Sequence, residues 1–386
     1  MLEKAELTLI IMLSKTKKVI TTHLIVLCSV ASRKLFYSIA WRVGTLSLQF
    51  VPPAEGGGME IIMRDIFVNG YAYPSISQEV LADWLPSLTF VSCFSYGFAE
   101  DGHIIQLEDD ALREPAAAAG VKALMVLTPM DETGMFSNNR AKALLESPAA
   151  QENFLNDIVS ALEQKNMFGV DFDFEYVYSE NREQYAQLIG ETRQRLNPMG
   201  YIVTAALAPK TSADQPGLLY QGHDYSLIGQ AANLCLLMTY EWGYTYGPPM
   251  AVAPPDAVRR VIEYGLTEIP SEKILMGIPN YGYDWKLPFI KGESKAEKIT
   301  NDEAVARAAG YGAEIMFDEQ AMSPYYRYTD EDNAEHEVWF EDRRSMEAKF
   351  SLIDEYNLAG ISWWNIMSRF PEGTEELRER FTVIKV

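Results

Sequence analysis

The chain has 386 residues, with 54 acidic and 33 basic side chains, so its formal net charge is −21 at pH 7. With 48% hydrophobic and 23% charged residues, it can bury a large core and is not intrinsically disordered. Cys28, Cys93 and Cys235 lack CxxC spacing, which excludes a disulfide framework and disfavours a zinc or thiol-redox enzyme. The negative charge disfavours binding to nucleic acids and to anionic membranes, and it favours a neutral substrate.

The first 60 residues differ from the rest, because they hold seven basic and four acidic residues whereas the remainder holds 26 and 50. The apolar run 19–31 follows three lysines and is too short for a membrane span, so it indicates a signal-like segment. Residues 35–45 (LFYSIAWRVGT) resemble instead the first helix of a LysM peptidoglycan-binding module, which makes a degenerate LysM remnant the alternative. Residues 51–58 have the composition of a linker. We therefore expect a leader over 1–60 and a catalytic domain over 61–386.

Short apolar segments then alternate regularly with segments of helical length. The predicted strands are residues 66–72, 88–94, 123–129, 168–175, 202–208, 234–240, 274–280 and 360–364. Helical patterns lie between them, for example at 153–162, 182–196 and 255–264. Nearly continuous apolar strands that alternate with helices predict a parallel sheet covered by helices. Eight such strands predict an α/β fold, a closed (β/α)8 TIM barrel.

The connection between the seventh and eighth predicted strands is unusually long. Residues 286–345 within it indicate a small α+β insertion, with a helix at 302–309 and strands at 313–317, 325–328 and 336–340. Without this insertion the segment from 66 to 364 has 239 residues, close to the roughly 250 of a typical TIM barrel. We expect the insertion to form a wall beside the active face.

The predicted fourth strand carries acidic residues at every second position. Asp171, Asp173 and Glu175 share one face, whereas Phe172 and Phe174 share the other. Inside a barrel, carboxylates are costly unless they are paired or protonated, so this row should retain a proton and raise the pKa of one member. Glu175 is nearest to the C-terminal mouth and is the predicted general acid. The phenylalanines disfavour one alternative, an acidic strand end in solvent. A cation site is the other alternative, and it would need further oxygen ligands nearby.

This segment resembles the DxxDxDxE signature of glycoside hydrolase family 18, the chitinase-like retaining glycosidases, although Phe168 replaces the first Asp. Residues 238–242 (MTYEW) resemble the family's Met-x-Tyr-Asp segment, with Glu241 for Asp, and residues 277–285 resemble Gly-x-Pro-x-Tyr-Gly-x-x-Trp. Residues 360–364 place Trp364 where the family keeps a tryptophan beneath the sugar. Residues 69–73, 241–244 and 339–342 are most similar to bacterial spore-cortex and cell-wall N-acetylglucosaminidases, which often carry LysM modules.

The resemblance implies a substrate-assisted mechanism, in which the 2-acetamido oxygen of the substrate is the nucleophile. It implies that Glu175 is the acid and then the base, that Asp173 orients the acetamido group, and that Asp171 holds Asp173. Tyr240 would bind the acetamido group and Trp364 would stack beneath the sugar. No metal or organic cofactor is needed. The expected substrate-binding residues are Tyr71, Glu241, Trp242, Asn280, Tyr281, Trp285 and Trp364.

Some roles stay open at this point. Tyr240 is either a substrate contact or a buried barrel tyrosine, and one of Trp363 and Trp364 must face the helices. Glu241 either contacts sugar hydroxyls or caps its loop. The aromatic residues of the sixth and seventh strand ends either line sugar subsites or pack the insertion; they are Trp242, Tyr244, Tyr246, Tyr281 and Trp285.

We therefore expect an extracellular, cell-wall or spore-associated glycosidase, monomeric and without a membrane span. Its expected substrate is a glycan that contains N-acetylglucosamine, with peptidoglycan or cortex fragments foremost. The alternatives are a chitinase, an endo-N-acetylglucosaminidase acting on N-glycans, and a catalytically silent lectin on the same fold. The presence of Glu175 favours the enzymes over the lectin. The four histidines are scattered, which disfavours a Ser-His-Asp triad and a histidine-ligated metal site.

Overall fold

The computed structural model describes residues 7–16, 19–30, 33–42, 45–50, 63–131 and 133–386. The chain divides into two compact units, Met1–Ile62 and Met63–Val386. The linker expected at 51–58 lies outside the described residues. Among those that are described, no helix is long and apolar enough to cross a membrane.

The first unit contains a four-stranded antiparallel sheet in chain order. Its strands are β1 (Leu7–Thr16), β2 (Val19–Val30), β3 (Arg33–Arg42) and β4 (Thr45–Phe50). The helix implied by the LysM resemblance is therefore not formed, because that segment up to Arg42 is strand β3. Tyr37, Ile39 and Trp41 have side chains that favour strands, and they recur with the period of a strand.

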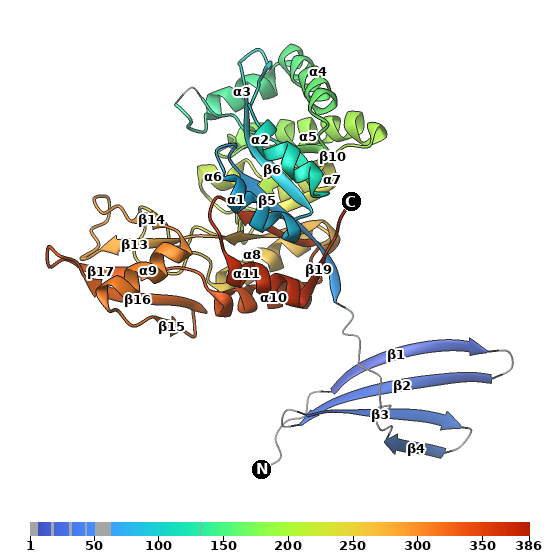
Figure 1. Cartoon of the computed structure of the whole chain (residues 1–386). Coiled ribbons are helices and arrows are strands. Elements are labelled where there is room, and N and C mark those ends of the chain that lie inside the picture. Colours follow the sequence, from blue (N-terminus) through green and yellow to red (C-terminus); the bar gives the residue numbers. More distant parts are fainter. Residues whose placement is uncertain (1–6, 17–18, 31–32, 43–44, 51–62, 132) are drawn as a thin grey trace. The chain divides into compact units, whose positions relative to one another are not determined.

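The second unit is a closed barrel of eight parallel strands with helices outside it (Figure 1). The barrel closes because β5 pairs with both β6 and β18. Each predicted barrel strand is present, so the predicted (β/α)8 barrel is confirmed. In order around the barrel the strands are β5 (Arg64–Ala72), β6 (Phe90–Phe98), β8 (Lys122–Leu127), β9 (Gly169–Phe172), β10 (Ile202–Leu207), β11 (Leu234–Leu237), β12 (Ile274–Pro279) and β18 (Gly360–Trp364).

Amphipathic helices cover the barrel. The described helices of this unit outside the insertion are α1 (Gln78–Trp84), α2 (Asp110–Ala118), α3 (Asn138–Glu146), α4 (Pro148–Lys165), α5 (Arg182–Leu196), α6 (Leu218–Gln221), α7 (Tyr225–Ala231), α8 (Pro255–Glu268), α10 (Arg343–Tyr356) and α11 (Pro371–Arg380). Short elements add 3-10 turns and sheet edges: η1 (Leu85–Ser87), η2 (Ser179–Asn181), η3 (Asn197–Met199), η4 (Ser271–Lys273), β7 (Ile104–Ile105) and β19 (Phe381–Val383).

The helix ends follow ordinary capping chemistry. Ser147 accepts a hydrogen bond from the backbone at the start of α4, whose first residue is Pro148. The same helix ends at Lys165, and the C-cap residue Asn166 has the left-handed conformation. This local agreement between sequence and structure explains why the long helices could be predicted.

The insertion lies between β12 and β18 and forms its own five-stranded antiparallel sheet with one helix (Figure 1). Its elements are β13 (Gly282–Lys286), β14 (Glu297–Ile299), α9 (Asn301–Tyr311), β15 (Met316–Asp318), β16 (Ser323–Thr329) and β17 (Glu335–Trp339). The predicted helix and three strands are present. The insertion sheet, however, starts at Gly282 rather than at 286, because β13 pairs with both β14 and β17.

Two barrel strands end three residues before their predicted ends, and both end beside the same cavity. Strand β9 ends at Phe172, and β11 ends at Leu237 rather than at Tyr240. After β11 the backbone bends, with the amide of Thr239 donating to Leu237 and that of Tyr240 donating to Met238. Asp173 and Glu175 after β9, and Tyr240 after β11, line this cavity.

Candidate active site

A cavity of about 490 Å³ lies at the carboxyl ends of the barrel strands. Its walls come from β5, β10, β11 and β18, from the helix α6 and from the loops that follow β9 and β11. The lining residues are Tyr71, Asp173, Glu175, Tyr176, Ala206, Leu219, Tyr220, Leu236, Met238, Tyr240, Glu241, Tyr244 and Trp364. The structure thus brings together six of the eleven predicted site residues, from four segments of the chain.

Asp171 lies deepest in the acidic row and is 2% exposed. The hydroxyl of Tyr71 donates to its Oδ2 at 2.5 Å, and the hydroxyl of Thr204 donates to its Oδ1. Burial raises the pKa of Asp171, although both hydrogen bonds act in the opposite direction. Tyr71 therefore reaches this carboxyl group as well as the cavity.

Asp173 is the buried carboxylate that lines the cavity itself. It is 5% exposed, and its Oδ1 atom has no hydrogen-bond partner among the residues that the structure describes. Burial raises its pKa well above the ordinary value, and the negative charges of Glu175 and Asp171 raise it further. Such a carboxyl group is costly to ionise, because burial and both neighbouring charges disfavour its negative form.

Glu175 is half-buried on a turn just after β9. Burial raises its pKa from 4.5 to about 7, with a further contribution from the negative charge of Glu241. The next residue, Tyr176, has φ of 57°, and Glu241 has φ of 68°, both in the left-handed region. Non-glycine residues in this region are uncommon and occur often at functional sites.

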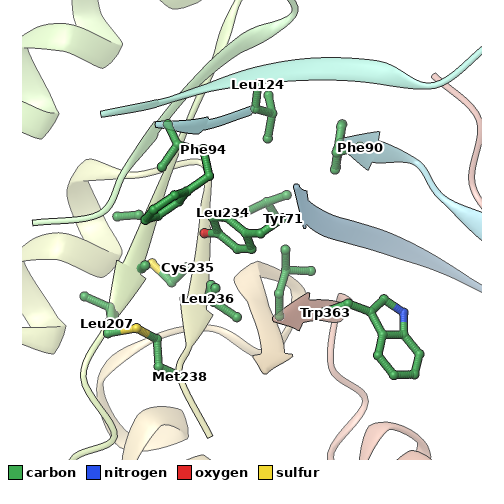
Figure 2. Packing of buried hydrophobic residues seen from close by; sticks show 14 of the residues in the cluster. Tyr71, Phe90, Phe94, Leu124, Leu207, Leu234, Cys235, Leu236, Met238 and Trp363 are labelled. Carbon is green, nitrogen blue, oxygen red and sulfur yellow. The ribbon is translucent and has the colours of Figure 1, made fainter. Parts of the chain in front are cut away.

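Aromatic side chains form the rest of the cavity wall. Trp364 is half-buried and makes edge contacts with Tyr71 and Phe94, with ring centroids 5.5 and 5.0 Å apart. Trp363 is fully buried against Trp84, and in Figure 2 its ring points away from Tyr71. The open choice between the two tryptophans is therefore settled by the geometry, because only Trp364 faces the cavity.

Tyr240 also faces the cavity, and a glycine on the next strand makes room for it. A Cβ atom at Gly277 would lie 2.7 Å from the ring of Tyr240 and 2.6 Å from the carbonyl oxygen of Leu237. Only a residue without a side chain fits there. Gly277, the first glycine of the motif in the seventh strand, thus leaves the space that the ring of Tyr240 occupies.

Glu241 is held by two tyrosines of the neighbouring strand end. The hydroxyl of Tyr283 lies 3.0 Å from both carboxylate oxygens, and the hydroxyl of Tyr281 donates to Oε1. Tyr281 is buried, and the amine of Lys298 lies 3.6 Å from its ring centroid. Tyr281 therefore supports the cavity wall through Glu241 and does not line the cavity.

Two predicted substrate-binding residues, Asn280 and Trp285, are placed elsewhere. Asn280 is 2% exposed, and its amide nitrogen donates to the backbone carbonyls of Asn365 and Ser368. Trp285 is 1% exposed and donates to the carbonyl of Gly247 at 2.8 Å. Their polar atoms are satisfied within the protein, so these residues join loops around the site. Trp242 is half-buried against the core and also does not line the cavity.

Several cavity residues were not predicted from the sequence. Tyr176 directly follows the acidic row, and this position was the signal that could have identified it. Leu219 and Tyr220 come from the short helix α6, which has no motif and reaches the cavity only through the fold. Phe168, which replaces the signature Asp, stacks on Phe90 at 5.9 Å just before β9 and lies outside the cavity.

The arrangement can transfer protons but shows no cation centre. Within residues 63–131 and 133–386, no group of three His, Cys, Asp or Glu side chains is arranged to hold a metal ion. Glu175 can be protonated near neutral pH and touches the cavity, as a general acid must. A flat aromatic surface, Trp364, lies in the same cavity and suits the apolar face of a sugar ring.

Comparisons with known proteins agree with this chemistry. The chain is 39% identical over 328 residues to the cortical fragment-lytic enzyme of Bacillus subtilis, which is 83% of this chain and 76% of that protein. The crystal structure of the spore cortex-lytic enzyme SleL from Bacillus cereus superimposes with a TM-score of 0.81 and 34% identity, covering 88% of this chain and 78% of that one.

A chitinase from Chromobacterium violaceum is also similar, with a TM-score of 0.74 and 25% identity over 81% of this chain and 98% of that one. The glycosyl hydrolases family 18 matches residues 110–368, which is more than half of the chain. This match includes the acidic row and extends past Trp364 at the end of β18. The chain therefore belongs to the glycosyl hydrolases of family 18 and is a glycosidase.

Proposed function

We propose that the protein hydrolyses glycans containing N-acetylglucosamine, with retention of configuration, by a substrate-assisted mechanism. The observation that carries this proposal is the buried acidic row at the barrel mouth. Asp173 and Glu175 both have raised pKa values because of burial and like charge, and both line the cavity with Trp364. Such a pair can supply one proton and one negative charge to the same bound sugar.

In the proposed reaction, Glu175 protonates the glycosidic oxygen while the acetamido oxygen of the substrate attacks the anomeric carbon. The bond to the leaving group breaks, and an oxazolinium ion forms. Asp173 accepts a hydrogen bond from the acetamido N–H and balances the positive charge, and Asp171 supports Asp173. Water then attacks the anomeric carbon, with Glu175 now acting as base.

The remaining predicted residues have supporting roles in this proposal. Tyr240 donates its hydroxyl to the acetamido group, and Trp364 stacks beneath the sugar; both line the cavity. Tyr71 and Glu241 also line the cavity and contact the substrate in this proposal. Asn280, Tyr281 and Trp285 position the surrounding loops through the hydrogen bonds described above.

Peptidoglycan or cortex fragments are the proposed substrates. Support comes from the similarity to the cortical fragment-lytic enzyme of Bacillus subtilis and to SleL. By the same similarity we propose a location in the cell wall or on the spore. A chitinase is the second candidate, because the chain also resembles the Chromobacterium violaceum enzyme.

Product analysis tests the activity and the substrate together. Purified protein is incubated with cortex fragments, chitin oligomers and N-glycans, and the released reducing ends are identified by mass spectrometry. Glu175→Gln should lower the rate by about 10²–10⁴-fold, because the general acid is lost. Glu180→Gln is the control, since Glu180 lies on an exposed turn of η2 with 58% of its side chain exposed. An unchanged rate in Glu175→Gln would refute the proposal.

An inhibitor separates the two possible nucleophiles. A cyclic thiazoline that mimics the oxazolinium ion should bind at least as tightly as substrate, because it resembles the intermediate. If the enzyme is active and the thiazoline does not inhibit, a protein carboxylate is the nucleophile instead, and Glu241 is then the residue to substitute.

A further inference from the structure

His223 lies between α6 and α7 and is completely buried. Its Nδ1 accepts a hydrogen bond from the amide of Ala208, and its Nε2 lies 2.9 Å from the carbonyl oxygen of Phe174. An amide can only donate and a carbonyl can only accept, so Nε2 carries the hydrogen and the ring is neutral. Burial lowers the pKa of His223 to about 4, which agrees with a neutral ring.

These two hydrogen bonds join the chain just after β9 to the chain just after β10. Phe174 immediately precedes Glu175, so the imidazole is bound one residue before the proposed general acid. Gly222, the residue before His223, packs against the backbone on the other side of Glu175, at Val177. A Cβ atom at Gly222 would lie 2.2 Å from the carbonyl oxygen of Val177, which shows how closely these backbones approach.

Glu175 and Tyr176 therefore lie between two residues whose backbones are held in place, Phe174 by the hydrogen bond from His223 and Val177 by its close contact with Gly222. Across the part of the chain that the structure describes, no hydrogen bond or ion pair from another group holds the Glu175 carboxyl group. Tyr176 adopts φ of 57°, which an L residue reaches at a cost. The position of the Glu175 side chain must therefore be set by the backbone on both sides of it.

We propose that His223 is a positioning residue for Glu175, and that the segment Gly222–His223 fixes the backbone of the acid in the orientation needed for proton transfer. This inference rests on the proposed role of Glu175. Proton transfer requires a heavy-atom separation of about 2.6–3.2 Å, so a small displacement of residue 175 lowers the rate of the chemical step.

The surroundings of His223 keep its geometry fixed. The amine of Lys210 donates to the carbonyl oxygen of His223 at 2.9 Å, and the hydroxyl of Tyr225 donates to the carbonyl of Ala208 at 2.6 Å. The ring of Tyr185 packs 5.9 Å from the imidazole. These contacts come from the loop after β10 and from helices α5 and α7, so the imidazole has one orientation.

His223→Phe keeps an aromatic ring but removes both hydrogen bonds. We expect kcat to fall about 10–100-fold, with KM changed by less than about threefold, because substrate binding is retained and the acid is misplaced. His223→Gln should recover much of the activity, because its amide offers one acceptor and one donor. Gly222→Ala is an independent probe and should lower kcat although the imidazole is intact.

Tyr326→Phe is the matched control. It removes the buried hydrogen bond from the Tyr326 hydroxyl to Ala304, at 2.8 Å, in the insertion. Its kcat should stay within about twofold of the parent, since a remote buried hydrogen bond contributes only to stability. Thermal unfolding of every variant identifies changes caused by loss of folded protein.

The outcomes separate this inference from the proposed function. If His223→Phe is folded and keeps the parent kcat while Glu175→Gln is inactive, the positioning role is refuted and the role of Glu175 stands. If Glu175→Gln is active, the proposed function is refuted, and the positioning role of His223 is refuted with it. Should His223→Phe not fold, His223→Gln is compared with His223→Asn, whose shorter side chain does not reach Phe174. Equal kcat values for these two variants would then refute the inference.

Discussion

Two buried aspartates of this molecule have opposite surroundings. Asp109, at the start of α2, is completely buried and binds Arg113 at 3.0 Å, Lys165 at 2.9 Å and the hydroxyl of Tyr96. Burial by itself would raise the pKa of Asp109, but hydrogen bonds from these three groups bring it below the ordinary value. Asp173 is almost as buried, but within the described part of the chain it has no cation beside it, and its pKa is raised.

The difference separates carboxylates that support the fold from those placed for chemistry. A buried charge with two cations and a hydroxyl is compensated, and it stabilises the arrangement of β6, α2 and α4. A buried carboxyl group without a cation costs stability when it is ionised, and its pKa is raised. A buried carboxyl group of raised pKa can exchange a proton with a substrate. The uncompensated carboxyl groups therefore lower the stability of the barrel at the site where activity is expected.

The largest expected effect is on activity at the uncompensated site. Asp173→Asn should lower kcat/KM by about 10²–10³-fold, because it removes the negative charge that balances the oxazolinium ion. The free energy of unfolding should stay the same or rise, since a carboxyl group of raised pKa is replaced by a neutral amide. Steady-state kinetics and urea unfolding measure the two effects. A stable variant with parent activity would show that Asp173 is not catalytic.

The same substitution at the compensated site should have the reverse effect. Asp109→Asn should lower the free energy of unfolding by about 3 kcal/mol, because Arg113 and Lys165 lose their buried partner. The folded fraction should retain the parent kcat, since Asp109 does not line the cavity. If Asp109→Asn and Asp173→Asn change stability by the same amount, the contrast between the two sites is wrong.

The next effect is a dependence of stability on pH. Because the pKa of Glu175 is raised from 4.5 to about 7 on folding, the folded protein binds this proton more tightly than the unfolded chain. The resulting stabilisation is complete below about pH 4.5 and is lost as the pH rises through about 7. Relative to Glu175→Gln, the free energy of unfolding of the parent should fall by about 1–2 kcal/mol between these pH values. This value is smaller than the full pKa shift would give, because Glu175 is partly exposed to solvent. Urea unfolding of both proteins across this range measures it, and parallel curves would contradict the shift.

The smallest expected effect is on the pH profile of activity. The parent kcat/KM should fall above about pH 7, because Glu175 must be protonated to act as acid. Glu241→Gln removes a negative charge that raises the pKa of Glu175, so this fall should move to lower pH. Glu180→Gln should leave the profile unchanged. If kcat/KM of Glu241→Gln falls at the same pH as that of the parent, a group other than Glu175 controls the profile.

Much of the fold could be predicted because its signals are local. Apolar strands alternate with amphipathic helices, and the capped helix α4 and the helix α5 follow their sequence patterns closely. The acidic row is also local, since a side-chain period of two places Asp171 and Asp173 on one face. Asn280 and Trp285 could not be placed in this way, because a motif does not show whether a polar atom finds its partner in a distant loop.

The sequence by itself determined the barrel, the order of its strands and the chemical types of residue at the strand ends. Only the tertiary structure decided which of these residues meet. Closure of β18 on β5 places Trp364 beside Tyr71, and α6 contributes Tyr220 without any motif. His223 reaches Phe174 across 49 positions of the chain. These contacts join segments far apart in sequence, and their distances depend on strand register and loop path, which no local pattern encodes.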